Sequence, residues 1–242
     1  MKPTIWATNE DGTIEFVSLT SEFLEGAIEV TRRACIPNEA ACVAAGVTKC
    51  EGSMKKIEEF VIITAKQGAS IVAIEKKSKR VIGSIFNLIR VYGSDEDAAI
   101  NESFSSFDAS KLLCDILLYA EEQCNLFERC NVDCLLEMNL LGILPEFRRR
   151  GIGEKMIEVS TELATKLYKG INVKVPLDGT EELSLEPRPK LISAIFSSPY
   201  TMKIGRSLNY EIAATVDMQK FLVNDKPLPG LQHFTLEFKK LE

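Results

Sequence analysis

The chain of 242 residues is 45% hydrophobic and 26% charged, with a formal net charge of −6 at pH 7. This length buries a core as one large domain or two small ones, and the composition is that of a globular protein. The acidic balance argues against non-specific nucleic-acid binding, which needs an extended basic face, and it would attract a cationic substrate. No apolar stretch reaches the roughly 18–20 residues that span a bilayer, and the first residues lack the apolar segment of a signal peptide. We therefore expect a cytoplasmic protein with no membrane or nucleic-acid partner.

Periodicity predicts the following elements in chain order. In the first half we expect a strand over 13–19, helices over 22–35 and 39–46, a helix over 53–67, a hairpin over 69–91, a loop over 93–108 and a helix over 112–127. In the second half we expect a strand over 135–143, a helix over 152–169, strands over 171–175 and 191–196, a helix over 200–208, and strands over 210–218 and 234–240. The expected N-caps of the first three helices are Thr20 or Ser21, Asn38 and Ser53.

This order of elements predicts one domain over residues 1–242. Strands, helices and a strand–turn–helix–strand unit are typical of an α/β or α+β fold around a central mixed sheet. The polar, Pro-containing stretch 176–190 is expected to be a surface insertion.

The thiols and the single imidazole restrict the chemistry. An odd number of scattered cysteines predicts reduced thiols in the cytosol. Cys130 and Cys134 have no second pair nearby, and His233 lies far along the chain, so we expect no metal site. Proton transfer must then use carboxylates, hydroxyls, water or the substrate, because His233 is expected at the surface near a C-terminal strand. The cysteines are Cys35, Cys42, Cys50, Cys114, Cys124, Cys130 and Cys134.

A cationic turn joins the apolar strand to the long helix that follows it. Arg148, Arg149 and Arg150 precede Gly151-Ile152-Gly153, and a helix start of this kind presents unpaired backbone N–H groups and a partial positive charge to an anion. A dinucleotide fingerprint would need a third glycine at position 156, and a P-loop would need Gly-Lys-Ser/Thr, so neither fits. A basic helix start with glycines for tight packing is the alternative.

The segment from Leu141 to Gly153 resembles the acetyl-CoA signature of the GNAT superfamily of N-acetyltransferases. That signature is a strand with a Val/Ile-x-Pro exit and then Arg/Gln-x-x-Gly-x-Gly/Ala. The resemblance implies a central mixed, mostly antiparallel sheet flanked by helices, and backbone amides that hold the CoA pyrophosphate. It implies acetyl-CoA contacts at Leu141, Gly142, Ile143, Arg148, Arg149, Arg150, Gly151, Ile152, Gly153 and Glu154.

Flanking segments are similar to the insect arylalkylamine (dopamine) N-acetyltransferases. The similar stretches are "AEEQCNLFERC", "KGINV", "SSPYTMKIGRSLNYE" and, near the N-terminus, "RRACIPNEAA". The chain departs from that family where Glu-Pro-Leu becomes Glu39-Ala40-Ala41 and Ser-Ser-x-Tyr-Ser becomes Ser197-Ser198-Pro199-Tyr200-Thr201. These changes and the insertion at 176–190 bear on the amine pocket.

Four residues are implied as catalytic by this resemblance. Glu39 occupies the position of the general base, with a pKa that a partly apolar cleft would raise; its alternative is an acidic residue in the first turn of a helix. Ser197 and Thr201 correspond to the hydroxyls that pass a proton to the leaving thiolate, and the serines before the helix are alternatively N-caps. Tyr200 is a phenol donor to the thiolate or a packed aromatic residue.

The predicted function is an N-acetyltransferase that moves an acetyl group from acetyl-CoA to a small primary amine, expected to be an arylalkylamine, by direct attack in a ternary complex. Two alternatives stay open: acetylation of a peptide or protein amine, and a GNAT-fold protein that binds CoA without catalysis. The expected partners are acetyl-CoA and the amine, and the expected state is a monomer or weak dimer.

Overall fold

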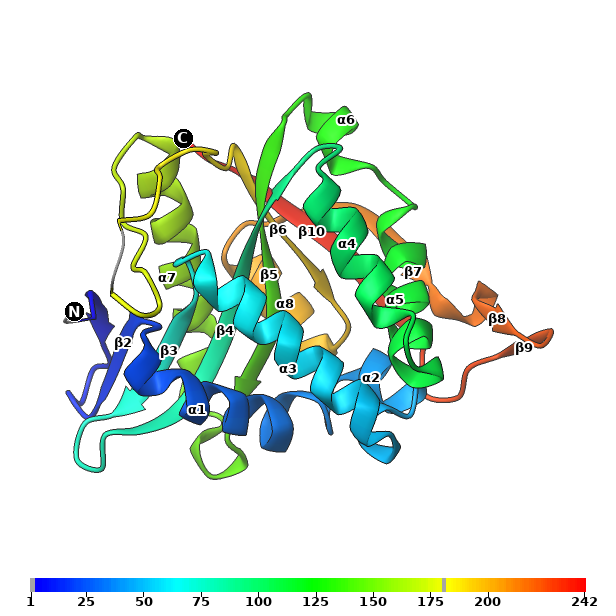
Figure 1. The fold of residues 1–242 in the computed structure, drawn as a ribbon, viewed down its shortest axis with the longest axis horizontal. Helices are drawn as coiled ribbons and strands as arrows, with labels where there is room; N and C mark the ends of the chain where they lie inside the picture. Colours follow the sequence, from blue (N-terminus) through cyan, green and yellow to red (C-terminus); the bar gives the residue numbers. More distant parts are fainter. Residues whose placement is uncertain (1–2, 180–181) are drawn as a thin grey trace.

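A long twisted sheet is the centre of the fold. The computed structural model describes residues 3–179 and 182–242, and within them eight strands form one sheet in the order β1-β2-β3-β4-β5-β6-β10-β7 (Figure 1). Every neighbouring pair is antiparallel except β5 and β6, which are parallel. The mixed, mostly antiparallel sheet predicted above is confirmed. The strands are β1 Ile5–Thr8, β2 Ile14–Ser18, β3 Ile71–Glu75, β4 Arg80–Val91, β5 Cys134–Ile143, β6 Leu191–Phe196, β7 Glu211–Asp217 and β10 His233–Lys240, with a separate hairpin of β8 Leu222–Val223 and β9 Lys226–Pro227.

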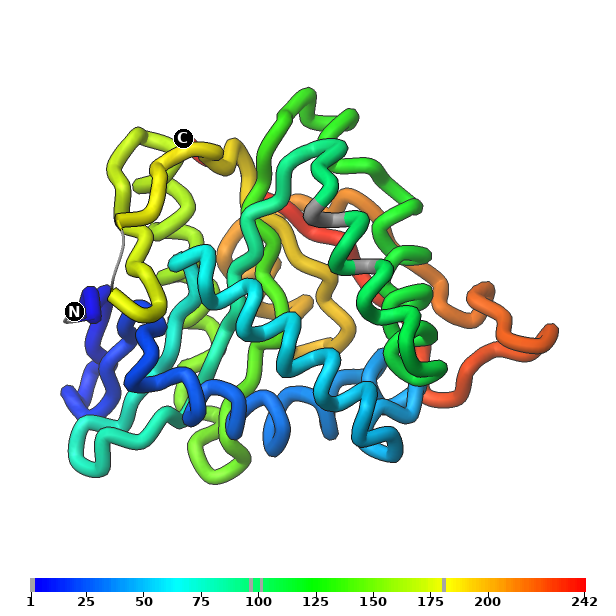
Figure 2. Tube along the Cα trace, in the orientation of Figure 1, coloured from blue at the N-terminus to red at the C-terminus, as the bar shows by residue number. Residues whose placement is uncertain are grey.

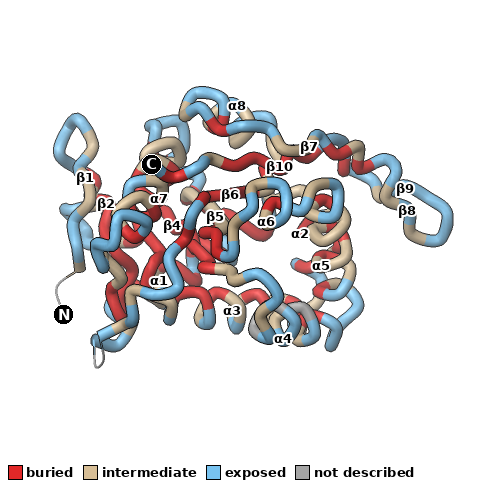
Figure 3. Tube along the Cα trace, turned by 90° about the horizontal axis from the view of Figure 1, so that it is seen from above, coloured by how far each residue is buried: buried red, intermediate tan, exposed pale blue. Residues whose placement is uncertain are grey.

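Helices cover both faces of this sheet. In Figures 1 and 3, α1, α3 and α4 lie on one side and α7 and α8 on the other. No helix in residues 3–179 and 182–242 is long and apolar enough to cross a membrane. The helices are α1 Ser21–Val30, α2 Ala40–Ala44, α3 Glu51–Lys66, α4 Asp95–Phe104, α5 Asp108–Glu121, α6 Leu126–Cys130, α7 Ile152–Tyr168 and α8 Pro199–Ser207; short turns of other helix types are η1 Thr31–Cys35, η2 Val47–Lys49, η3 Pro145–Phe147 and η4 Met218–Lys220.

The long helix α7 shows why the periodicity was informative. Its buried side chains recur at helical spacing and face the sheet, while the opposite face carries charged residues. Gly170, in the left-handed conformation, follows its end. The buried positions that define the stripe are Ile152, Met156, Val159, Leu163 and Leu167.

Two sequence predictions about the middle of the chain are wrong. Residues 93–108 are not a loop, because α4 forms there and Phe104 packs edge-on against Phe60 of α3, with ring centroids 5.9 Å apart. The expected single helix over 112–127 is two helices, α5 and α6, because the Asn125 side chain accepts hydrogen bonds from the amides of Phe127 and Glu128 and begins a new helix. Figure 2 follows the chain from β4 through α4 into α5.

The expected strand over 171–175 is also absent from the described residues, where the chain runs without regular structure. The Val175 amide donates to the Gly68 carbonyl, and the ammonium of Lys174 donates to the carbonyls of Ser184 and Leu185. The segment therefore makes its hydrogen bonds to the insertion and to the residues that follow α3, and not to the edge of a sheet. Strand β1, which pairs with β2, was not predicted because its four residues give too short a pattern.

Candidate active site

The site begins where β5 and β6 separate. These two strands are paired only at Leu136 with Ile192 and at Glu137 with Ser193. Further along β5 a bulge sets Leu140 and Leu141 against Ile85 of β4, and Leu140 adopts the left-handed conformation with φ 49°. In the described part of the chain, β6 therefore does not pair with β5 beyond Glu137. The Ile143 carbonyl accepts from Arg148, and residues 137–141 line a cavity.

A cavity of about 130 Å³, here called the central cavity, occupies this separation. Seven parts of the chain line it: the segment from η1 into α2, β4, α5, β5, α7, the end of β6 and the start of α8. Glu39, Ser197 and Thr201, predicted as catalytic from two distant motifs, all lie in its wall. The other lining residues are Cys35, Cys42, Ile85, Leu113, Leu117, Glu137, Met138, Asn139, Leu140, Leu141, Ile157, Ala194, Ile195 and Phe196.

Glu39 is held at the N-terminus of α2. It is the N-cap residue, and its Oε2 accepts a hydrogen bond of 2.6 Å from the backbone amide of Cys42. The predicted cap at Asn38 is wrong, because the Asn38 side chain instead donates to the carbonyl of Ala34 at the end of η1. The capping bond fixes the carboxylate of Glu39 in the wall of the central cavity.

Two thiols lie beside Glu39 in the same wall. Burial raises the pKa of Cys35 and Cys42, and the neighbouring Glu39 raises both further. Both thiols are therefore neutral at pH 7 and poor nucleophiles, since the thiolate is the reactive form.

The start of α8 supplies hydroxyls to the cavity. Ser198 is the N-cap of α8: its Oγ accepts from the Thr201 amide at 3.2 Å and lies 2.9 Å from Thr201 Oγ1. The capping alternative therefore holds for Ser198, while Ser197 and Thr201 line the cavity. Tyr200 is 83% exposed and is not among the lining residues, so the structure does not bring it to the other three.

The cationic turn, residues 148–153, connects β5 to α7. Arg148 does not point freely into solvent: its Nε donates to the Ile143 carbonyl at 3.1 Å and its Nη2 to the Ala34 carbonyl at 3.2 Å. The Arg150 guanidinium lies over the ring of Phe147, 5.3 Å from its centroid. Arg148 therefore connects the turn to the end of β5 and to η1. Arg149 and Arg150 contribute the positive charge of the turn.

The first turn of α7 is shaped for a close anion. Gly151 is the N-cap with φ 72°, and a Cβ placed on it would meet no atom within 4 Å. No side chain of the described residues caps this helix, so its first amides, including those of the buried Ile152 and of Gly153, are available to a ligand. Glu154 accepts a hydrogen bond from Ser207 of α8 at 2.7 Å, which joins the two helices beside the turn.

Gly142 serves packing. A Cβ at Gly142 would lie 3.1 Å from Val30 Cγ1 and 3.2 Å from Cys35 Cβ, so this glycine lets η1 approach β5. Ile143 is paired with Gly83 in the sheet. Of the predicted strand contacts, Leu141 alone lines the central cavity.

Two further cavities adjoin the central one on the α5 side, and Glu137 lines all three. The apolar cavity, about 110 Å³, lies among α3, α4 and α5, and the large cavity, about 310 Å³, lies among α5, α6 and the strands. Glu137 was not among the site residues predicted from the sequence. The signal was present, because it is the one acidic residue in the otherwise uncharged run 135–145.

The arrangement was compared with known proteins. No protein-family model matches the sequence, and no curated protein is similar to it. Solved structures, however, match over nearly the whole chain. Arylalkylamine N-acetyltransferase 2 of Aedes aegypti superposes with a TM-score of 0.76 at 20% identity, covering 95% of this chain and 99% of that one. A GNAT superfamily phosphinothricin acetyltransferase of Sinorhizobium meliloti in complex with AcCoA gives a TM-score of 0.52 at 14% identity, over 95% of this chain and 89% of that one.

The chain has the GNAT acetyltransferase fold. A third structure of this fold, a polyamine N-acetyltransferase of Drosophila melanogaster that forms N-acetylagmatine, superposes with a TM-score of 0.71 at 17% identity, covering 94% of this chain and all of that one. The fold predicted from residues 141–153 is thereby confirmed. In this GNAT fold the parallel pair β5 and β6, the bulge at Leu140 and the turn into α7 form one continuous path.

Proposed function

We propose that this chain is a single-domain acetyl-CoA-dependent N-acetyltransferase acting on a small primary amine. One observation carries the proposal: the central cavity brings Glu39, Ser197 and Thr201 together where β5 and β6 separate. Amine acetylation needs a base for the ammonium, alignment of two reactants and a proton for the leaving thiolate. A cytoplasmic location and a monomeric or weakly dimeric state remain predictions.

The turn and the strand edge fit acetyl-CoA. Gly151 leaves open space where any other residue would place a Cβ, and the uncapped amides of α7 suit a pyrophosphate, to which the helix start adds partial positive charge. The edge of β5 beyond Glu137 offers main-chain groups to the pantetheine arm. When bound there, acetyl-CoA supplies the thioester acetyl group.

The residues of the central cavity divide the proton transfers between them. Glu39, oriented by the Cys42 amide, accepts a proton from the incoming ammonium, directly or through water. Thr201 Oγ1, with Ser197 also in the wall, relays a proton to the departing sulfur and regains one from Ser198 Oγ or water, so that it stays a neutral hydroxyl. Because the thiols of Cys35 and Cys42 are neutral, direct attack by the amine is favoured over an acetyl-cysteine intermediate.

The acceptor proposed is an arylalkylamine. The apolar cavity beside Glu137 is lined by Phe60, Leu88, Phe104 and Leu117, which suit an aromatic tail. The similar GNAT structures include enzymes described as acting on arylalkylamines and as forming N-acetylagmatine. The described part of the insertion 176–190 lines none of the three cavities, so it leaves this pocket unchanged.

The proposal is tested by measuring thiol release from acetyl-CoA with a panel of arylalkylamines, alkylamines, polyamines and lysine peptides. We expect release with phenethylamine-type acceptors and thermal stabilisation of the protein by acetyl-CoA alone. If no amine gives thiol release and acetyl-CoA does not stabilise the protein, the proposal of an enzyme is refuted. Stabilisation without release would indicate a CoA-binding protein that lacks catalysis.

A further inference from the structure

An ion cluster lies at the junction of the three cavities. Arg90 projects from β4, Glu121 from the end of α5 and Glu137 from β5. Nη1 of Arg90 donates to Glu121 Oε1 at 3.0 Å and to Glu137 Oε2 at 2.6 Å. The side chains are only 18%, 26% and 13% exposed, respectively. Removed from bulk water, such charges interact more strongly than surface pairs.

The cluster marks the far end of the path that an acceptor takes from the central cavity. Glu137 lines all three cavities, while Arg90 and Glu121 line the apolar and the large cavity. Glu39 lies in the central cavity, which contains no lysine or arginine. An amine whose reacting nitrogen is beside Glu39 and whose tail passes Glu137 therefore meets the guanidinium of Arg90.

Carboxylates in such a pocket would ordinarily recruit a second cation from the ligand. The large cavity contains a third one, Glu122, in addition to Glu121 and Glu137. Arg90 already supplies a permanent positive charge to two of them, because a guanidinium does not deprotonate in proteins. Arg90 therefore offsets part of the carboxylate charge, and it lowers the affinity of the pocket for a distal ammonium several-fold to many-fold relative to the carboxylates without it.

We infer that Arg90 is a specificity-determining residue that takes the place of a distal cation of the acceptor. It thereby selects amines with one ammonium and an uncharged tail over diamines of the same length. The uncharged tail has a place in the apolar cavity, among Phe60, Leu88, Phe104 and Leu117. This inference rests on the proposed function and names the charge class of the acceptor.

The test compares n-hexylamine with 1,6-diaminohexane, which differ only in the terminal group. For the wild-type protein we expect kcat/KM for thiol release to be about tenfold or more higher with hexylamine, because its uncharged tail enters the apolar cavity without the desolvation of a second ammonium beside Arg90. Arg90→Met removes the charge, and the ratio should shift about tenfold or more towards the diamine, mainly through KM. Arg90→Lys keeps a positive charge and should keep the wild-type preference.

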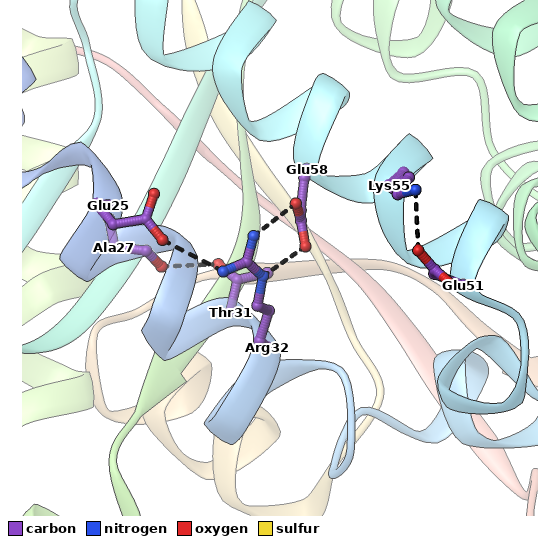
Figure 4. A network of polar contacts seen from close by, with 7 residues as sticks. All are labelled: Glu25, Ala27, Thr31, Arg32, Glu51, Lys55 and Glu58. Atoms are coloured by element: carbon purple, nitrogen blue, oxygen red, sulfur yellow. Dashed lines mark hydrogen bonds and ion pairs between the residues drawn. The ribbon is translucent and has the colours of Figure 1, made fainter.

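A matched control separates this effect from the general loss of an ion pair. Arg32 is also a guanidinium held by two carboxylates, Glu25 and Glu58 (Figure 4). It lines none of the three cavities. Arg32→Met should leave the hexylamine to diaminohexane ratio unchanged. Arg90→Gln, which retains amide donors for both carboxylates, is the second uncharged variant if Arg90→Met does not fold.

The outcomes are distinguishable from those of the proposed function. If wild-type protein acetylates diaminohexane as well as or better than hexylamine, the inference is wrong while the enzyme assignment stands. The inference is equally overturned if the ratio stays at the wild-type value in a folded Arg90→Met or Arg90→Gln variant. No thiol release with either amine, and none with phenethylamine, would overturn both.

Discussion

The two halves of the site are built from different materials. The cationic turn and the first turn of α7 present backbone amides. Gly151 leaves them accessible because it has no side chain. The acceptor side is built from side chains that seven parts of the chain bring together, with the carboxylates of Glu39 and Glu137 among its polar groups. A main-chain site tolerates many side-chain changes but few backbone ones, whereas a side-chain site is altered by single atoms. Substitutions on the two sides of the site should therefore differ in their effects.

The largest effect is expected at Glu39. Glu39→Gln retains an oxygen that can accept from the Cys42 amide, so α2 keeps its cap, but it cannot take a proton. We expect kcat/KM at pH 7 to fall by about 10²–10⁴-fold, and the deficit to shrink as the pH approaches the pKa of the amine, which then arrives deprotonated. The measurement is a pH–rate profile of thiol release.

The exposed carboxylate of Glu25, changed to Gln, is the control for that profile. Its profile should match the wild type. A Glu39→Gln variant with a constant deficit at every pH would remove Glu39 from the role of base.

The backbone half is probed at Gly151. Gly151→Val places a branched side chain in the open space beside the α7 amides, and we expect acetyl-CoA affinity, measured by calorimetry, to drop by about tenfold to a hundredfold. Valine is also strained at φ 72°. Gly12→Val is the matched control, because Gly12 has φ 72° and open space too but lies in the β1–β2 turn. If both variants bound acetyl-CoA equally well, the turn would not be the anion site.

A smaller effect is expected where the leaving group is protonated. Thr201→Val keeps the shape of the side chain and removes its hydroxyl, so kcat should fall by about tenfold with acetyl-CoA affinity unchanged. Ser198→Ala, by contrast, removes the cap of α8 and should cost about 1 kcal/mol of stability. A Thr201→Val enzyme with wild-type kcat would assign the proton to another group.

The smallest effect concerns the support of α8. Glu237 of β10 is fully buried beneath Gly205, and among the described residues its Oε2 has no hydrogen-bond partner. Burial raises the pKa of this carboxyl, so its contribution to stability is present at low pH and is lost as the pH rises through the folded-state pKa. Glu237→Gln should therefore stabilise the protein at pH 7 by about 1 kcal/mol, with no gain below about pH 4. Denaturant unfolding at the two pH values measures it, and equal shifts at both would contradict the assignment.

The two halves of the site also differ in how much of each could be predicted from the sequence. The turn is contiguous, and its glycines, arginines and preceding apolar strand are local features, so the fold was predicted from residues 141–153 and the anion site is proposed from the same residues. The acceptor side depends on which distant residues the sheet brings together. The helix α4, which carries Phe104 to the apolar cavity, was predicted as a loop because its apolar positions are few and its tertiary contact with Phe60 is not local. Glu137 has a local signal as the one acidic residue of the run 135–145, but its ion pair with Arg90 was not predictable because it joins different strands.

The side-chain roles at the turn were only partly predictable. Three arginines in a row suggested three phosphate ligands, but Arg148 donates to two main-chain carbonyls and holds the turn in place. The local pattern predicts an anion site, but it does not show which arginines are structural, because that depends on the packing of η1 against β5. Tyr200 shows the same limit, because one residue of register on α8 separates it from Thr201 in the cavity wall.

The central claim is that the cationic turn and the acceptor side serve one reaction. It is tested most directly with a bisubstrate compound in which CoA is joined through an acetyl linker to phenethylamine. If both regions belong to one site, this compound should bind about 10²–10⁴-fold more tightly than CoA, as measured by calorimetry. Affinity equal to that of CoA would contradict the account, because the acceptor cavities would then not be reached from the turn.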